Sequence, residues 1–317
     1  MPAGTNYNAQ QSRTQPDFGD EVFDGISTNN ALVWMLRQSG NIKVSEGGRT
    51  FTHPLLYALN TTFAARAHDA TISGADPQTH THSEWTPAVI SGRIDLFKLH
   101  QAQNQGKAAI LRYLEEKKQA AIVSMTEILG DELVDGSGTA PSWDSLETII
   151  STTNTTTVGN IAGSDATWQN YADTSGVTNF GTASEGIIAM DLAVRSTTFG
   201  TKSPRAIFTT SAVYGFYYAT QAGNIRYYNE ELADAHFEHL NFGRRPVLWD
   251  DNIDAGRMYF VDTDSLWLQV LKQGNLVTTE FIPSTNQLSD SALMYLFGQL
   301  TTGSRRTQGV VTGLTTY

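Results

Sequence analysis

The feature that most constrains this chain is an uninterrupted helical pattern over residues 103–136. Charged residues occupy one side of the pattern, and no proline interrupts it. Its apolar residues recur at helical spacing: Leu111, Leu114, Ala121, Met125, Ile128 and Leu129. A helix of about 30 residues is a rod roughly 45 Å long, well above the ~11–12 residues of a mean helix. In a chain otherwise rich in strands and loops, such a rod indicates a shell or scaffold element more than an enzyme core.

Charged residues are scarce: they make up 17% of the 317 residues, against ~25% in typical soluble domains. Uncharged polar residues replace them, which suits surfaces that become contacts, because desolvating a charge is costly. The net charge of −11 argues against a protein that grips nucleic acid through a basic face, but not against one that encloses it. The chain has no cysteine, which excludes disulfides, thiol nucleophiles and thiolate metal sites.

The N-terminal region reads as an arm followed by a short helix. Residues 1–20 are polar and contain no signal-like apolar stretch, and no 18-residue apolar run occurs anywhere in the chain. We therefore expect an arm that depends on a partner, and no membrane span. Residues 21–40 predict a short amphipathic helix that is capped at Ser27, Thr28 or Asn29 and ends at Gly40.

Two alternating stretches then predict a long β-hairpin. Residues 49–63 and 89–100 each place apolar side chains at every second position, and the region between them is polar. We expect the two stretches to pair with each other as a hairpin of roughly 50 residues. Because a two-stranded ribbon is only marginally stable alone, we expect it to lie on a neighbouring subunit.

The rest of the chain combines helices and strands, ends in a run of strands, and contains no internal repeat. Helices are predicted at residues 185–198 and 211–223, and strands at 205–211, 245–250, 257–262, 267–271, 276–282 and 292–300. The element order predicts an α+β fold rather than a regular βαβ alternation.

Two histidine pairs are candidate metal ligands. His80 and His82 share one face of a predicted strand, and His236 and His239 are three residues apart, with Glu231 and Asp234 nearby. Neither pair has a recognised ligand spacing, so a solvated surface is the preferred interpretation of both.

Other charged clusters have plain structural interpretations. The acids at Asp250, Asp251, Asp254, Asp262 and Asp264 flank predicted turns, where aspartate bonds its own backbone. The pairs Arg305–Arg306 and Arg244–Arg245 are expected to make subunit salt bridges or to lie on the surface. No nucleophile elbow, P-loop or dinucleotide fingerprint is present.

Several stretches together resemble the major capsid protein of tailed bacteriophages, which has the Hong Kong 97 fold. In chain order they are residues 30–36 (NALVWML), 47–57 (GGRTFTHPLLY), 93–95 (RID), 104–136, 157–162 (TVGNIA), 166–170 (ATWQN), 205–211 (RAIFTTS), 243–250 (GRRPVLWD) and 305–311 (RRTQGVV). Each is weak alone, and the specificity lies in their order and spacing over nearly the whole chain.

The resemblance implies an α+β capsid subunit with six regions. These are an N-terminal arm (1–25), an N-terminal helix region (26–44), an extended β-hairpin loop (45–101), the spine helix of a peripheral domain (102–140), an axial domain (141–255), and strands returning to both domains (256–317). Such subunits form the hexamers and pentamers of an icosahedral shell enclosing double-stranded DNA. The implied place is the virion capsid, assembled in the host-cell cytoplasm.

The resemblance implies intersubunit contacts rather than a catalytic site, and no metal or cofactor is expected. The contact residues that we predict lie at the loop tip (His68, Asp69, Asp76, His80, His82, Trp85), in the arm (Phe18, Phe23) and in the axial region (Arg226, Tyr227, Tyr228).

The expected partners are further copies of the chain, a separate scaffolding protein, a portal and a decoration protein. The scaffold is expected to be separate because only about 20 residues precede the fold, fewer than a fused scaffolding segment needs. No lysine lies between Lys43 and Lys98, so the covalent cross-link of some family members has no donor in the loop.

Two alternatives remain open from the sequence. A tail-tube subunit also combines an α+β core with an extended loop, although so long a helix is less expected there. A metal-dependent hydrolase would use His236, His239 and the acids near them.

Overall fold

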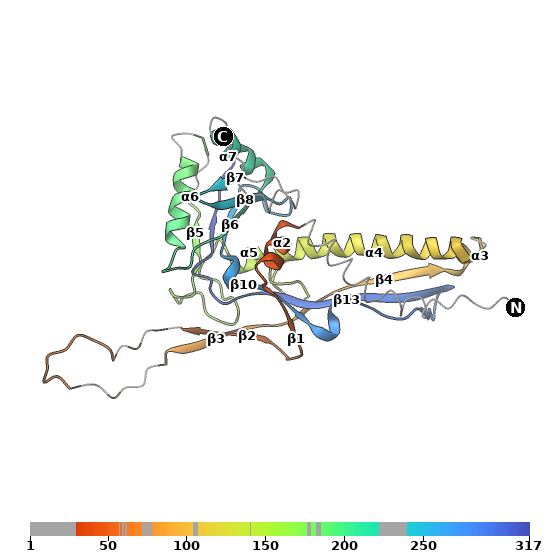
Figure 1. Ribbon diagram of the computed structural model, residues 1–317, viewed down its shortest axis with the longest axis horizontal. Coiled ribbons are helices and arrows are strands. Elements are labelled where there is room, and N and C mark those ends of the chain that lie inside the picture. Colours follow the sequence, from red (N-terminus) through yellow and green to blue (C-terminus); the bar gives the residue numbers. More distant parts are fainter. Residues whose placement is uncertain are drawn as a thin grey trace.

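The computed structural model describes residues 30–317 except 57, 59, 61, 72–73, 75–77, 104–106, 140, 176–178, 182–184 and 222–239. These residues form two six-stranded sheets, a separate two-stranded hairpin, one long helix and several shorter helices (Figure 1). The helices are α2 (Ala31–Gln38), α3 (Lys98–Gln103), α4 (Lys107–Asp135), α5 (Leu146–Ile149), α6 (Glu185–Ser196) and α7 (Ser211–Gln221). The strands are β1 (Ile42–Ser45), β2 (Phe51–Leu56), β3 (His80–Trp85), β4 (Ala88–Phe97), β5 (Tyr171–Asp173), β6 (Ala206–Thr209), β7 (Leu240–Phe242), β8 (Arg245–Trp249), β9 (Met258–Val261), β10 (Leu266–Leu271), β11 (Val277–Thr278), β12 (Ile282–Pro283), β13 (Ser289–Thr302) and β14 (Gly309–Val311).

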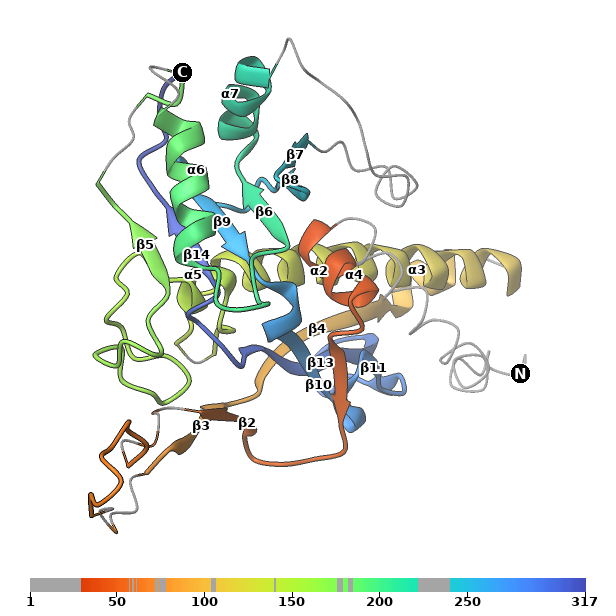
Figure 2. The same cartoon turned by 60° about the vertical axis from the view of Figure 1, so that its left-hand side comes forward.

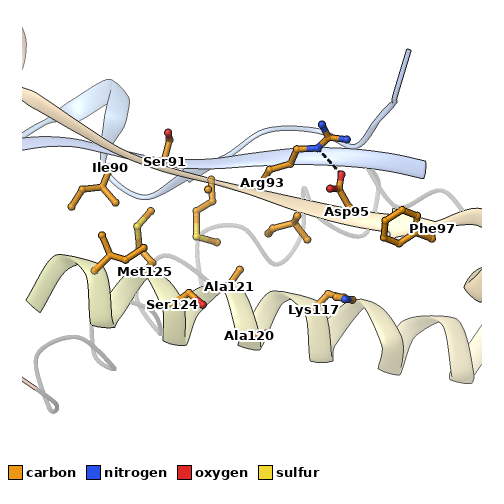
Figure 3. A pocket seen from close by; sticks show the side chains of 14 residues that line it. Ile90, Ser91, Arg93, Asp95, Phe97, Lys117, Ala120, Ala121, Ser124 and Met125 are labelled. Carbon is orange, nitrogen blue, oxygen red and sulfur yellow. Dashed lines mark hydrogen bonds and ion pairs between the residues drawn. The ribbon is translucent and has the colours of Figure 1, made fainter. Parts of the chain in front are cut away.

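Helix α4 confirms the predicted rod. Its 29 residues span about 44 Å, and Figure 3 shows side chains of α4, such as Met125, directed towards β4. Leu114, Met125 and Leu129 are buried as the spacing predicted, whereas Ile128 remains 48% exposed. The apolar face of α4 is therefore wider than the part of it that the sheet covers.

The short helix α2 confirms the predicted element, but its cap lies one residue later than expected. Asn30 Oδ1 accepts a hydrogen bond from the Val33 amide at 3.0 Å, which satisfies one free N–H of the first turn. The helix ends at Gln38, and Gly40, which follows the C-cap Ser39, has a φ of +68° that is easily adopted only by glycine.

The prediction that residues 49–63 and 89–100 pair with each other as a hairpin is wrong. β2 pairs with β3, from Phe51 opposite Trp85 to Leu56 opposite His80. β4 leaves the hairpin and pairs with β13 over ten positions. The alternation of residues 89–96 reflects burial of one strand face beneath α4, because Ile90, Ile94 and Leu96 are buried there. The projecting loop is therefore shorter than residues 45–101.

The first sheet, which we call the spine sheet, is built around β13. β4 lies on one edge of β13, while β10, β11 and β12 pair along its other edge, and β1 pairs with β10. One apolar core joins this sheet to α2 and α4.

The second sheet has the order β5-β14-β9-β6-β8-β7. Helices α6 and α7 lie together on one face of it, on the far side from α4 (Figure 2). Ile207 of β6 belongs to the core under these helices, whereas Phe208 belongs to the core shared with the spine sheet. Because successive strand residues face opposite sides, this sheet joins the two cores.

The predicted elements after residue 185 are confirmed with small shifts. Residues 185–198, 205–211 and 211–223 contain α6, β6 and α7, and residues 245–250 and 257–262 contain β8 and β9. Residues 267–271 and 292–300 lie in β10 and β13, while residues 276–282 hold β11 and reach the start of β12. None of the helices in the described part of the chain is long and apolar enough to cross a membrane.

The packing of α4 on the sheet predicts a large effect at one position. Leu129 is 1% exposed, so Leu129→Ala should lower the free energy of unfolding by about 2–5 kcal/mol through lost burial and the cavity left behind. Val123 on the same helix is 52% exposed, and Val123→Ala should change it by less than about 0.5 kcal/mol. Urea unfolding followed by circular dichroism measures both, and equal losses would contradict this packing.

Candidate functional site

The hairpin β2–β3 and the loop at its end project from the body of the molecule (Figure 1). Leu56 at the end of β2 is 63% exposed, and Phe63 in the loop is 84% exposed. Arg66 donates hydrogen bonds to the carbonyls of Thr62 and Thr71 in the same loop, at 2.8 Å each. An exposed phenylalanine on a ribbon that the described chain does not cover is a surface suited to another molecule.

The base of the hairpin is anchored through Trp85. Its side chain is 1% exposed, and its indole N–H donates to Ser83 Oγ at 3.1 Å. The neighbouring Glu84 amide donates to the Gly159 carbonyl at 2.9 Å, and Asn160 donates to the Glu84 carboxylate at 3.3 Å. The turn at residues 158–161 therefore fixes where the hairpin leaves the body.

His53 on β2 makes a second anchor. Its Nε2 lies 3.0 Å from Thr301 Oγ1 and 3.2 Å from the Gln269 amide nitrogen, and its ring stacks on Trp267 at 4.5 Å. Burial, and secondarily the charge of Lys43, lowers the pKa of His53 to about 4. The imidazole is therefore neutral near pH 7, and its Nε2 accepts the amide proton of Gln269.

Arg305 ties together the segment between α5 and β5, which contradicts its expected place at the surface or in a subunit salt bridge. Its side chain is 0% exposed. The guanidinium donates to the carbonyls of Ile149 and Thr156, at 2.8 and 3.2 Å, and to Asn170 Oδ1 at 2.7 Å. Burial lowers the pKa of Arg305 to about 10, so it still carries its charge at neutral pH. Arg306 is exposed as expected, and its guanidinium lies 3.8 Å from the centre of the Phe199 ring.

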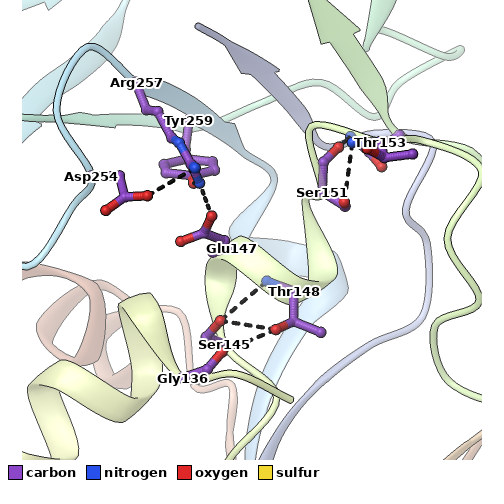
Figure 4. A network of polar contacts seen from close by, with 10 residues as sticks. Gly136, Ser145, Glu147, Thr148, Ser151, Thr153, Asp254, Arg257 and Tyr259 are labelled. Atoms are coloured by element: carbon purple, nitrogen blue, oxygen red, sulfur yellow. Dashed lines mark hydrogen bonds and ion pairs between the residues drawn. The ribbon is translucent and has the colours of Figure 1, made fainter. Parts of the chain in front are cut away.

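A second arginine joins the spine helix region to the second sheet. Figure 4 shows Arg257 between the carboxylates of Glu147 on α5 and Asp254, and both are ion-paired to it. Asp135, Glu147 and Asp254 form the one group of three or more potential metal ligands within the described ranges. Because Arg257 pairs with two of these three acids, the arrangement is a structural ion-pair network.

Two of the five predicted turn acids, Asp250 and Asp262, bond the backbone of their turns as expected, whereas Asp254 and Asp264 form ion pairs with Arg257 and Arg205. Asp250 accepts a hydrogen bond from the Asn252 amide at 3.1 Å, and Asp262 accepts one from the Asp264 amide at 3.2 Å. Burial raises the pKa of both Asp250 and Asp262. These contacts are side chain to backbone within one turn, which is the usual role of aspartate there.

The residues predicted to make intersubunit contacts do not lie together in the structure. His68 and Asp69 are exposed in the loop, whereas His80 and His82 are exposed on β3 and not at the tip. His82 Nε2 pairs with Glu84 at 2.9 Å, and His80 Nδ1 lies 2.8 Å from Thr79 Oγ1. Trp85 is a correction, because it lies at the hairpin base, buried within its own chain. Phe18, Phe23, Asp76, Arg226, Tyr227 and Tyr228 lie outside the described residues, as do His236 and His239.

Sequence reasoning missed the anchors that orient the hairpin. His53 was predicted as a residue of a half-exposed strand, and its alternation with Phe51 was the available signal. Its partners Gln269 and Thr301 come from strands more than 200 residues later, so no local pattern links them to it.

With this geometry established, comparisons with known proteins identify the fold. The chain is similar to the capsid subunit of cyanophage A-1(L), with a TM-score of 0.64, 13% identity, and coverage of 87% of this chain and 90% of that chain. It is also similar to the capsid protein of a native GTA particle, with a TM-score of 0.57, 12% identity and coverage of 91% and 90%. An encapsulin complex of Synechococcus elongatus gives a TM-score of 0.54, 10% identity and coverage of 89% and 87%.

No protein-family model matches the sequence, and no curated protein matches it. The similarity is therefore one of structure, at identities far below those at which sequences reveal kinship. The chain has the capsid fold of tailed phages, the Hong Kong 97 fold, as the order of its sequence segments predicted.

The burial of His53 predicts a pH dependence of stability. The folded-state pKa of about 4 lies below the ordinary 6.5, so the unfolded chain binds the proton more readily between these values. The stability of the wild type relative to His53→Gln should therefore fall by about 3 kcal/mol as the pH drops from 6.5 to 4. Chemical unfolding of both proteins over this range is the measurement.

Asp144 provides a control, because its effect on stability changes with pH in the opposite direction to that of His53. Burial raises its pKa to about 6, so its contribution to stability is present at low pH and declines as the pH rises from 3.8 towards 6. The wild type compared with Asp144→Asn should show that opposite trend. Parallel pH profiles for the wild type and His53→Gln would contradict the neutral, buried His53.

Gly159 lies in the turn that packs against Trp85, and a larger residue there should clash with the Trp85 ring. Gly159 has a φ of +60°, and a Cβ there would lie 2.9 Å from Trp85 Cζ2. Gly200 has a φ of +62° with no atom within 4 Å of such a Cβ, so Gly200→Ala isolates the backbone strain. Gly159→Ala should cost about 1–3 kcal/mol more than Gly200→Ala. Thermal unfolding followed by tryptophan fluorescence compares them, and equal losses would contradict the anchor.

Proposed function

We propose that this chain is the major capsid protein of a tailed bacteriophage, which assembles as hexamers and pentamers into an icosahedral shell enclosing double-stranded DNA. The observation that carries the proposal is the capsid fold itself, which extends over 87% of this chain and 90% of a cyanophage capsid chain. The role is structural rather than catalytic, and the protein resides in the virion after assembly in the host cytoplasm.

The projecting hairpin supports assembly. Its loop carries an apolar ring into solvent, while its base is held by buried contacts at Trp85 and His53. A rigid base with an exposed apolar end suits insertion onto a neighbouring subunit, since little order is lost on binding. One such contact on every subunit is repeated by symmetry over the whole shell.

The net charge of −11 supports DNA as enclosed contents rather than as a tightly bound ligand. Acidic protein does not release counterions from DNA, so packaged DNA would be repelled from the wall instead of adhering to it. A scaffolding protein, a portal and a decoration protein are the partners that such a shell needs. The regions of the fold are proposed to act as a peripheral domain around the spine sheet and an axial domain around the second sheet.

Microscopy of the purified chain, alone and with its candidate scaffold, tests the proposal. Closed shells or capsomers with fivefold and sixfold views are expected. Narrow helical tubes would favour a tail-tube subunit, and a small oligomer that never polymerises would overturn the assembly role. Shells that contain a protein cargo and no DNA would make the chain a container like the encapsulin, not a phage capsid.

Phe63 provides a point test of the hairpin's role. Phe63→Ser removes an 84% exposed ring, so the folded subunit should keep its stability. Loss of an aromatic interface anchor worth about 2 kcal/mol per subunit would raise the protein concentration needed for assembly roughly thirtyfold. Light scattering over a dilution series measures this threshold. Phe63→Leu keeps an apolar side chain and should assemble near the wild-type threshold; unchanged assembly of Phe63→Ser would contradict the contact.

A further inference from the structure

The base of the hairpin rests on a segment that has no regular secondary structure. Residues 150–170 run from the end of α5 to the start of β5 without forming a helix or a strand. Irregular segments of more than about 15 residues are uncommon in compact domains unless they have a function. This segment reaches the hairpin through its turn at residues 158–161, so the contacts that fix the segment also fix that turn.

Arg305 fixes this segment at its beginning, middle and end. The guanidinium donates to the carbonyl of Ile149, just before the segment, to the carbonyl of Thr156 within it, and to Oδ1 of Asn170, its last residue. The Asn170 amide in turn donates to the Ser151 carbonyl at 2.8 Å. All three acceptors of Arg305 are neutral oxygens, and the planar guanidinium holds its donors in one fixed geometry. Arg305 therefore specifies the path of the segment rather than neutralising a nearby acid.

The turn at residues 158–161 is a tight one. Gly159 and Asn160 both have a φ of +60°. The amides of Val158 and Ile161 each donate to the other's carbonyl, at 3.1 and 3.2 Å. Positive φ at both central residues is the mark of a type I′ turn. Such a turn moves as one unit, so the residues that precede it decide where its tip lies.

The tip of this turn lies against β3. The Glu84 amide donates to the Gly159 carbonyl at 2.9 Å, and the Trp85 ring is so close that a Cβ at Gly159 would be 2.9 Å from it. His53 on β2 lies 3.0 Å from Thr301 Oγ1, which belongs to the same stretch of chain as the arginine. One short stretch of chain therefore holds β2 directly and holds β3 through the turn.

We propose that Arg305 is a positioning residue for assembly: through the turn at residues 158–161 it sets the direction in which the hairpin and its loop leave the subunit. Arg305 is buried within its own chain, so it acts through the turn and not by contact with a neighbour. A hairpin that is already held in the direction that a neighbour binds loses little order on binding. This role rests on the proposed function, because it requires the hairpin to bind a neighbouring subunit.

The distance between two spin labels tests the proposal on the unassembled, full-length subunit, which has no native cysteine. Leu56→Cys at the end of β2 and Val123→Cys on α4 are exposed positions for the labels. Double electron–electron resonance should give one narrow distance distribution in this background. Arg305→Lys keeps the charge but lacks the fork of donors, so its distribution should be about twofold broader.

Leu129→Ala is the matched control for a loss of stability. Leu129 is buried on α4, outside the segment and the hairpin, so its loss should weaken the subunit and leave the distribution narrow. Gly159→Ala pushes the turn away from the Trp85 ring and should broaden the distribution as Arg305→Lys does. The two changes together should broaden it no further, because they break the same link.

Thermal unfolding verifies that each variant is folded at the temperature of the measurement. If Arg305→Lys does not fold, Asn170→Ala takes its place, since it removes one of the three acceptors and should broaden the distribution less. An unchanged distribution in the folded variant would overturn the inference. Equal broadening in Leu129→Ala, or a sum of the two effects in the double variant with Gly159→Ala, would also overturn it.

Light scattering over a dilution series, on unlabelled protein, connects the direction of the hairpin to assembly. If the hairpin of Arg305→Lys points correctly about a tenth of the time, its affinity for a neighbour falls roughly tenfold, and the assembly threshold rises accordingly. Leu129→Ala should assemble near the wild-type threshold. A broadened hairpin with an unchanged threshold would overturn the role in assembly. A wild type that never forms shells, with the expected label distances, would refute the proposed function and leave the hold of Arg305 on the hairpin intact.

Discussion

The pairing of β13 within the spine sheet is the constraint on which the other parts depend. This strand of 14 residues binds β4 along one edge and β10, β11 and β12 along the other. Its buried face, with Met294 and Leu296, lies beneath α4, and burial of that face fixes the register, because a slip of one residue would expose it. The long helix, the edge strand and the exit of the hairpin therefore all take their positions from one strand.

Buried polar side chains then fix the positions of the hairpin and of the segment between α5 and β5, because apolar packing alone does not set their exact positions. His53 links the hairpin to β10 and β13 through Gln269 and Thr301. Arg305 holds the segment between α5 and β5 by three donated hydrogen bonds. Such groups are costly to bury unless satisfied, so each accepts only one arrangement of its neighbours. The direction of the projecting loop follows from these contacts, and a subunit that presents its loop in a fixed direction suits a symmetric shell.

The element types were largely predictable, because they depend on local patterns. The helix at residues 107–135 shows its apolar spacing, and the buried strand at 206–209 shows its short apolar run, within one stretch of sequence. The site was predicted less well. Trp85 looked like an exposed aromatic at a polar tip, and only its packing against the turn at Gly159 shows that it is an anchor. Arg305 looked like a surface base, because the carbonyls that it binds come from residues 149 and 156.

The sequence by itself determined the long helix, the mixed composition of helix and strand, the absence of cysteine chemistry and, through the order of its segments, the capsid fold. Only the tertiary structure decided that β4 pairs with β13 and not with β2, because alternation reports which face of a strand is buried but not by what. It also decided which polar residues are buried, since their partners are remote in the chain. Side-chain periodicity is a local property, whereas pairing and polar satisfaction depend on contacts between distant residues.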